Sequence, residues 1–312
     1  MKKILRFVVI SFIALMGVCS LLFGHFDRPV EDLKPGYAPV PSEFARVMGM
    51  EVHYRDEGNR QDSLPIVLVH GTGSSLHTFD NWTTALKGNH RVVRMDLPGF
   101  GLTGPFPDRN YSMDAYVDFI AAFLADRGIG HCILAGNSLG GQIAWNFTLK
   151  HSEVVEKLIL IDAAGYPKNS TSVPIAFRIA RTPVLNRILT FLTPRFVVKS
   201  SVLNVYADKS KVTDELVDRY FELSLRAGNR QGLIDRMQMP LDTSLVRKIK
   251  TIEQPTLILW GDQDGLIPLE SAYRFHRDLP NDTLVILKNS GHVPMEENPE
   301  ESLEAVMDFM KK

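Results

Sequence analysis

Short apolar runs alternate with amphipathic stretches along most of the chain after residue 47. The runs are rich in β-branched residues, which is typical of strands buried on both faces. The pattern predicts strands at 51–55, 66–69, 92–95, 132–135, 158–161, 257–260 and 284–287, and helices at 82–86, 113–126, 139–149, 271–278 and 302–310. Strands that alternate with helices predict an α/β fold, a mostly parallel twisted sheet covered by helices on both faces.

One long stretch breaks this alternation. Between residues 166 and 250 there is no clear strand, and the pattern predicts helices at 175–181, 184–191 and 213–227, with a turn near 194–196. Thr213 is expected to begin the last helix, because acidic residues follow it in the first turn. We therefore expect an all-helical cap at 166–250, inserted between two parts of the α/β core at 45–165 and 251–312.

The N-terminal segment has a different character. Lys2, Lys3 and Arg6 precede an uncharged, mostly apolar run at 7–23. A helix of that length spans roughly 25 Å, slightly less than the ~30 Å hydrocarbon core of a bilayer. We expect an uncleaved membrane anchor at 1–26, with the catalytic domain outside the cytoplasm because the positive flank stays inside. A cleaved signal peptide, which gives a secreted or periplasmic protein, is the alternative.

Prolines dominate the stretch that follows the apolar run. Pro29, Pro35, Pro39 and Pro41 fall within residues 27–44. Proline fixes one backbone dihedral and favours extended chain, so this stretch is expected to be an extended tether.

The composition excludes several classes of protein. The 35 basic and 36 acidic residues leave a net charge of −1, without the basic excess that is typical of a nucleic-acid-binding protein. Cys19 and Cys132 are too far apart for a zinc pattern, and both lie in apolar runs. With no glycine-rich dinucleotide turn or ligand cluster, we expect neither a cofactor nor a metal.

The sequence G-N-S-L-G at 136–140 matches the G-x-S-x-G pattern between a predicted strand and a predicted helix. In that context Ser138 stands on a sharp turn that projects its hydroxyl above the sheet. Glycines at the flanking positions have no Cβ to collide with neighbouring backbone. Ser138 is therefore the candidate nucleophile.

A serine hydroxyl needs a base, and the base needs an acid that orients it. His292 follows the predicted strand 284–287 and is the candidate base. Asp264 follows the strand 257–260 and is the candidate acid, with Asp262 and Asp162 as alternatives. Each lies beyond the C-terminal end of a strand, where parallel sheets place their sites.

An oxyanion formed by this attack would require N–H donors. Leu139, at the start of the helix after the nucleophile, is one candidate. Thr72, in the loop after strand 66–69, is the other, with Gly73 as its alternative. His70 in the same loop is expected to be structural.

Together these segments resemble the α/β-hydrolase superfamily, in particular its serine esterases and lipases with a helical cap. The resemblance covers about residues 45–312 and rests on H-G at 70–71, D-L-P-G-F-G at 96–101, G-N-S-L-G-G at 136–141, W-G-x-x-D at 260–264 and G-H at 291–292. It implies Ser138 as nucleophile, His292 as base, Asp264 as acid and a cap over the active site.

The resemblance implies hydrolysis of a small-molecule or lipid carboxylic ester through an acyl-enzyme intermediate. Two alternatives stay open: carbon–carbon bond hydrolysis of ring-cleavage diketones, and a non-catalytic binding protein on the same fold. Against the diketone hydrolases, Val293 stands where they resemble one another in having tryptophan. Asn137 is expected either to accommodate the turn or to touch the substrate, and Arg226, Arg230 and Arg236 are expected to form a solvated face.

Overall fold

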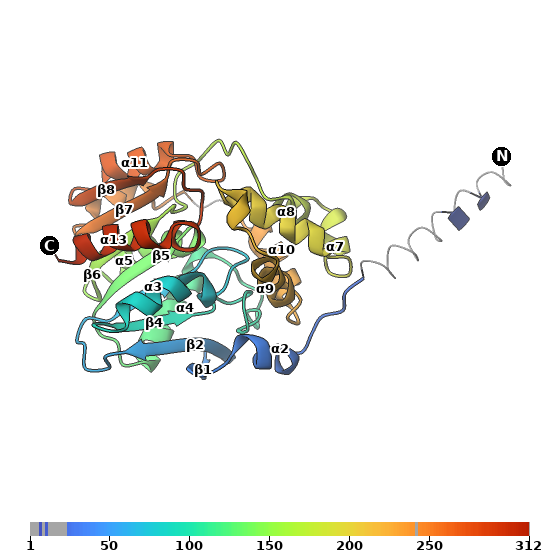
Figure 1. Ribbon diagram of the computed structural model, residues 1–312, viewed down its shortest axis with the longest axis horizontal. Coiled ribbons are helices and arrows are strands. Elements are labelled where there is room, and N and C mark those ends of the chain that lie inside the picture. The colour runs from blue at the N-terminus through green and yellow to red at the C-terminus, as the bar shows by residue number, and fades with distance from the viewer. Residues whose placement is uncertain (1–5, 8–9, 12–23, 241–242, 312) are drawn as a thin grey trace.

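The structure is a computed structural model that describes residues 6–7, 10–11, 24–240 and 243–311. Its centre is one sheet of eight strands, in the order β1-β2-β4-β3-β5-β6-β7-β8 (Figure 1). The strands are β1 (Ser42–Val47), β2 (Met50–Gly58), β3 (Ile66–Val69), β4 (Arg91–Met95), β5 (Cys132–Asn137), β6 (Val155–Ile161), β7 (Thr256–Gly261) and β8 (Asp282–Leu287). β1 and β2 pair antiparallel to their neighbours, and all later pairs are parallel, which confirms the predicted sheet.

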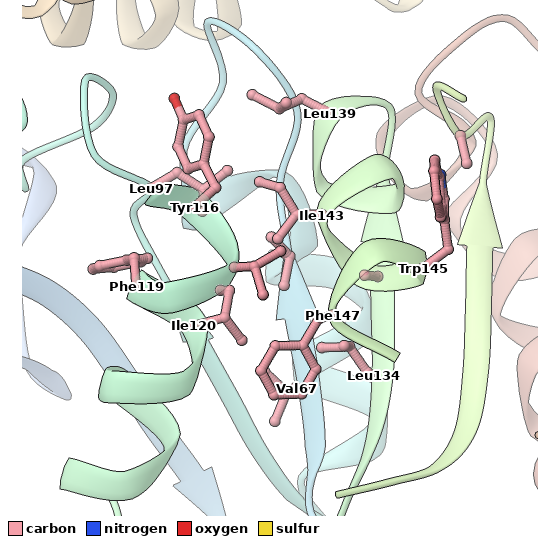
Figure 2. Packing of buried hydrophobic residues seen from close by; sticks show 14 of the residues in the cluster. Val67, Leu97, Tyr116, Phe119, Ile120, Leu134, Leu139, Ile143, Trp145 and Phe147 are labelled. Atoms are coloured by element: carbon pink, nitrogen blue, oxygen red, sulfur yellow. The ribbon is translucent and has the colours of Figure 1, made fainter. Parts of the chain in front are cut away.

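Helices cover both faces of the sheet because side chains alternate along each strand. Val67 and Val69 belong to one buried cluster, whereas Ile66 and Leu68 belong to the other. Figure 2 shows the first cluster, where residues of α4 and α5 lie against Val67. Around the core lie η1 (Leu76–Phe79), α3 (Asp80–Leu86), α4 (Met113–Asp126), α5 (Leu139–Lys150), η3 (Val246–Thr251), α11 (Glu270–Asp278), α12 (Pro294–Glu297) and α13 (Pro299–Met310).

The chain between β6 and β7 contributes helices that gather beyond one end of the strands (Figure 1). Thr213 Oγ1 accepts the N–H of Leu216, so Thr213 caps its helix as predicted. The predicted turn near 194–196 is wrong: Pro194 precedes the first residue of a helix, a position where proline's missing N–H costs nothing. The helices are α6 (Ile175–Arg181), α7 (Leu185–Leu189), α8 (Arg195–Val205), η2 (Lys209–Lys211), α9 (Asp214–Ser224) and α10 (Asn229–Gln238).

The stretch expected as an extended tether contains regular structure instead. Helix α2 (Val30–Tyr37) occupies its middle and β1 begins at Ser42. Leu33 of α2 is buried against Leu102 and Leu223, so packing overrides the preference of the prolines for extended chain. Pro29 stands just before the helix, where proline is tolerated.

The expected membrane anchor requires a correction. Among the described residues, no helix has both the length and the apolar composition needed to cross a bilayer. The prediction of a membrane-anchored protein with an extracytoplasmic catalytic domain is therefore wrong. The apolar run at 7–23 is itself marginal in length, since as a helix it would span roughly 25 Å against a core of ~30 Å. Most of that run, and the alternative cleavage site with it, lies outside the described residues.

Candidate active site

Ser138 stands on a tight turn between β5 and α5. Its backbone has φ 56° and ψ −114°, a conformation that L-residues rarely adopt. The turn fits only because its flanks are glycines. A Cβ on Gly136 would lie 2.2 Å from Gly140 O, and one on Gly140 would lie 2.1 Å from Val69 O. The local sequence thus places Ser138 at the C-terminal edge of the parallel strands.

His292 and Asp264 meet at this edge, although they come from different loops. His292 Nδ1 lies 2.6 Å from Asp264 Oδ2, and both side chains are buried. The other oxygen of Asp264 accepts the N–H groups of Leu266 and Ile267 at 2.8 and 2.9 Å. These bonds hold the carboxylate in one orientation, with one oxygen facing the imidazole.

Asn137 connects the turn at Ser138 to the loop that carries His292. Its Nδ2 donates to Ile161 O at 3.2 Å and to His292 O at 2.9 Å, and the residue is 2% exposed. The amide therefore ties the backbone of His292 to the residue before Ser138, a role that neither expectation from the sequence included. Within the described residues, no hydrogen bond joins the hydroxyl of Ser138 to the His292 ring.

A second positioning residue has no motif in the sequence. Glu297 is 2% exposed, and its Oε2 accepts the N–H of Gly291 at 2.7 Å. Its Oε1 accepts the N–H of Asp208 from the segment between β6 and β7 at 2.6 Å. His292 N–H also reaches that segment, donating to Val205 O at 2.8 Å. Only the nearness of Glu297 to His292 in sequence could have indicated this role.

The two candidate oxyanion donors lie where the sequence places them. Leu139 is the first residue of α5, where N–H groups have no acceptor within the helix. Thr72 follows β3 and lines a cavity together with its alternative, Gly73. His70 is structural: its Nε2 accepts the N–H of Leu97 at 2.9 Å, and burial lowers the pKa of the ring.

Two adjoining cavities of about 70 and 110 Å³ lie next to the Thr72 loop. Their walls are mainly apolar, with Val198 and Leu233 common to both. Two larger polar side chains contribute. The hydroxyl of Tyr220 lies 3.3 Å from Ser74 Oγ, and Arg230 is 5% exposed. Arg230 therefore does not belong to the solvated face that the sequence predicts.

Asp162, the alternative acid at the end of β6, lies close to Asp264 and His292. It is fully buried, and its Oδ1 accepts the N–H of Gly261 at 3.0 Å. Burial, together with the nearby charge of Asp264, raises its pKa well above the usual aspartate value. Among the described residues, Asp162, Asp264 and His292 are also the group whose ligand atoms approach closely enough, within 4.8 Å, to hold a metal ion.

Comparison with known proteins identifies a family and several relatives of this chain. A family model described as the alpha/beta hydrolase family matches residues 66–305. A 2-hydroxy-6-oxo-6-(2'-aminophenyl)hexa-2,4-dienoic acid hydrolase of Metapseudomonas resinovorans is 28% identical, over 86% of this chain and 90% of that protein. A solved meta-cleavage product hydrolase of Pseudomonas fluorescens IP01 superposes with a TM-score of 0.74 at 25% identity, over 86% of this chain and 97% of its own. A solved membrane phospholipase A gives 0.71 at 27% identity, over 100% and 98%. The chain belongs to the alpha/beta hydrolase family.

Proposed function

We propose that Ser138, His292 and Asp264 form a catalytic triad that attacks a carbonyl carbon. The observation that carries this proposal is the 2.6 Å hydrogen bond between His292 Nδ1 and Asp264 Oδ2. A proton held on Nδ1 leaves Nε2 free to accept the proton of the serine hydroxyl. Asn137 supports this role because it ties the backbone of His292 to the residue before Ser138.

In the proposed reaction, Ser138 Oγ bonds to the carbonyl carbon while His292 takes its proton. The N–H groups of Leu139 and Thr72 bind the negative charge that forms on the carbonyl oxygen. Collapse of this intermediate breaks the bond to the leaving group, which receives the proton from His292. Water then releases the acyl group by the same steps. We also propose that residues 166–250 act as the cap that covers this reaction, between core parts at 45–165 and 251–312.

For the bond that breaks, carbon–carbon hydrolysis of a diketone is the first candidate. The relatives named above include two hydrolases of ring-cleavage products, and they support this alternative better than the ester hydrolysis expected from the sequence. The chemistry demands a leaving carbon that can carry an electron pair, which a second carbonyl provides by forming an enolate.

Ester hydrolysis is the second candidate, and a specific observation favours it. The two cavities next to the Thr72 loop have apolar walls, which include Val198 and Leu233 in both and Leu223 in one. Such walls suit an acyl chain, because apolar surface gains free energy when it leaves water. The similarity to a solved phospholipase A is consistent with an ester substrate.

Turnover measurements with two substrate panels test the proposal. One panel contains p-nitrophenyl esters from acetate to palmitate. The other contains ring-cleavage diketones, whose hydrolysis is measured as a loss of their absorbance. We expect Ser138→Ala to lose all turnover and Ser210→Ala, which removes an exposed hydroxyl, to retain it. The active panel identifies the bond. No turnover in either panel, together with no labelling by a p-nitrophenyl phosphonate, would contradict the proposal in favour of a binding role.

A further inference from the structure

The N-terminal segment 24–28 is joined to the cap by backbone hydrogen bonds. Arg28 N–H donates to Leu225 O at 2.7 Å, and Arg28 O accepts the N–H of Ala227 at 2.8 Å. These bonds pair the segment with the chain between α9 and α10, the two helices that carry Leu223 and Arg230 to the cavity. The position of the segment is therefore fixed relative to the cavity wall.

This segment places one carboxylate on the cavity's buried cation. Asp27 Oδ1 accepts from Nε and Nη2 of Arg230 at 3.1 and 2.6 Å. Asp27 Oδ2 accepts the N–H of Gly228 at 3.0 Å, so both of its oxygens are engaged. The Arg230 side chain is 5% exposed, whereas that of Asp27 is 44% exposed. The ion pair thus has one end in the cavity wall and the other at the surface.

Among the described residues that line this cavity, Arg230 is the one with a charged side chain, and the other walls are largely apolar. A guanidinium in such surroundings attracts any carboxylate that enters, because buried charges require a counter-ion. Its fork of N–H groups fits a carboxylate well. Asp27 occupies the Nε–Nη2 side of this fork, and Nη1 donates to Thr193 Oγ1 at 3.4 Å. A substrate carboxylate that binds the Nε–Nη2 side of Arg230 would have to displace Asp27 from both Arg230 and Gly228.

We propose that Asp27 neutralises Arg230 and thereby makes the cavity select a substrate chain that carries no charge. The N-terminal segment is then a specificity-determining part of the site. Without the carboxylate of Asp27, the same cavity would bind a chain that ends in a carboxylate. This proposal rests on the carbonyl chemistry proposed for Ser138, but not on which bond breaks.

A matched pair of phosphonates tests the proposal. Both are p-nitrophenyl alkylphosphonates. One carries an octyl chain, and the other carries a chain of matched length that ends in a carboxylate. The second-order rate constant of labelling is measured from the release of p-nitrophenolate. We expect the wild type to react faster with the uncharged chain. In Asp27→Asn the ratio of the two rates should shift by roughly tenfold or more toward the charged chain.

Two further variants separate the ion pair from general effects. The double variant Asp27→Asn with Arg230→Met should prefer the uncharged chain again, because the cation is gone. Asp32→Asn removes an exposed carboxylate of α2 and should keep the wild-type ratio. A ratio in Asp27→Asn within about twofold of the wild type would overturn the proposal.

Failure of the proposed function gives a different result. If no phosphonate labels the protein, or if labelling persists in Ser138→Ala, the serine chemistry is contradicted. The role of Asp27 is then decided by calorimetric binding of octanamide and of suberic acid monoamide, which need no reaction. If the wild type and Asp27→Asn show the same ratio of affinities for these two amides, the proposed role of the ion pair is overturned.

Discussion

Two buried aspartates lie beside His292, but they differ in the partners of their oxygens. Asp264 is bonded to the imidazole and to two backbone N–H groups, which stabilise its negative charge. Asp162 accepts one N–H, and its other oxygen has no partner. Asp162 is therefore suited to the protonated, neutral form, and Asp264 to the role of orienting acid.

Substitution of each aspartate by asparagine tests this assignment. Asp264→Asn should lower kcat by about 10⁴-fold, because the imidazole loses the acceptor that fixes its tautomer. Asp162→Asn should lower kcat by less than about tenfold, since asparagine resembles the neutral acid in shape and keeps an acceptor for Gly261. The measurement is kcat on the active substrate panel. An equal loss in both variants would contradict the assignment.

Residue by residue, the sequence indicates the groups proposed to react more readily than the groups that hold them. Ser138 and His292 occur within motifs whose local geometry follows from neighbouring glycines and strand ends. Asn137 and Glu297 gain their roles from partners in other segments, and Asn137 lies 155 positions from His292. Such contacts exist only after folding. The burial of Arg230 was missed for the same reason, because its counter-ion comes from the N-terminal segment.

At the scale of single elements, helix α9 offers a clean test of capping. Thr213→Ala should lower the free energy of unfolding by about 1 kcal/mol, because the N–H of Leu216 loses its acceptor. Thr213→Ser keeps a hydroxyl at the same position and should restore most of this loss. Urea unfolding of the three proteins measures the difference. Equal stability of the alanine and serine variants would show that the hydroxyl does not act as a cap.

The elements that the pattern predicts are those with one dominant signal. The parallel strands are continuous apolar runs, and their predicted positions agree with β3 to β8 within a few residues. Helices α8 and α10 were missed because the first is rich in β-branched residues and the second contains Gly232 and many polar residues. Both are stabilised by packing within the chain between β6 and β7, which no local pattern reveals.

For the whole molecule, Asp162 links stability to pH. Burial and the charge of Asp264 raise its pKa, so the folded state retains this proton to a higher pH than the unfolded state does. Its stabilising contribution is complete below the pKa of an unfolded aspartate, about 3.9, and is lost as pH rises through the raised pKa. Asp162 should therefore lower the free energy of unfolding of the wild type as the pH rises between those two pKa values.

Asp162→Asn removes that proton equilibrium, because an amide does not titrate in this range. Between pH of about 5 and about 8, the free energy of unfolding should fall less in Asp162→Asn than in the wild type. Asp118→Asn, which removes an exposed carboxylate on α4, should follow the wild-type profile. Urea unfolding at the two pH values gives the comparison. If the free energy of unfolding falls equally in Asp162→Asn and in the wild type, Asp162 is already ionised in the folded protein. Asp162 and Asp264 then both carry a negative charge.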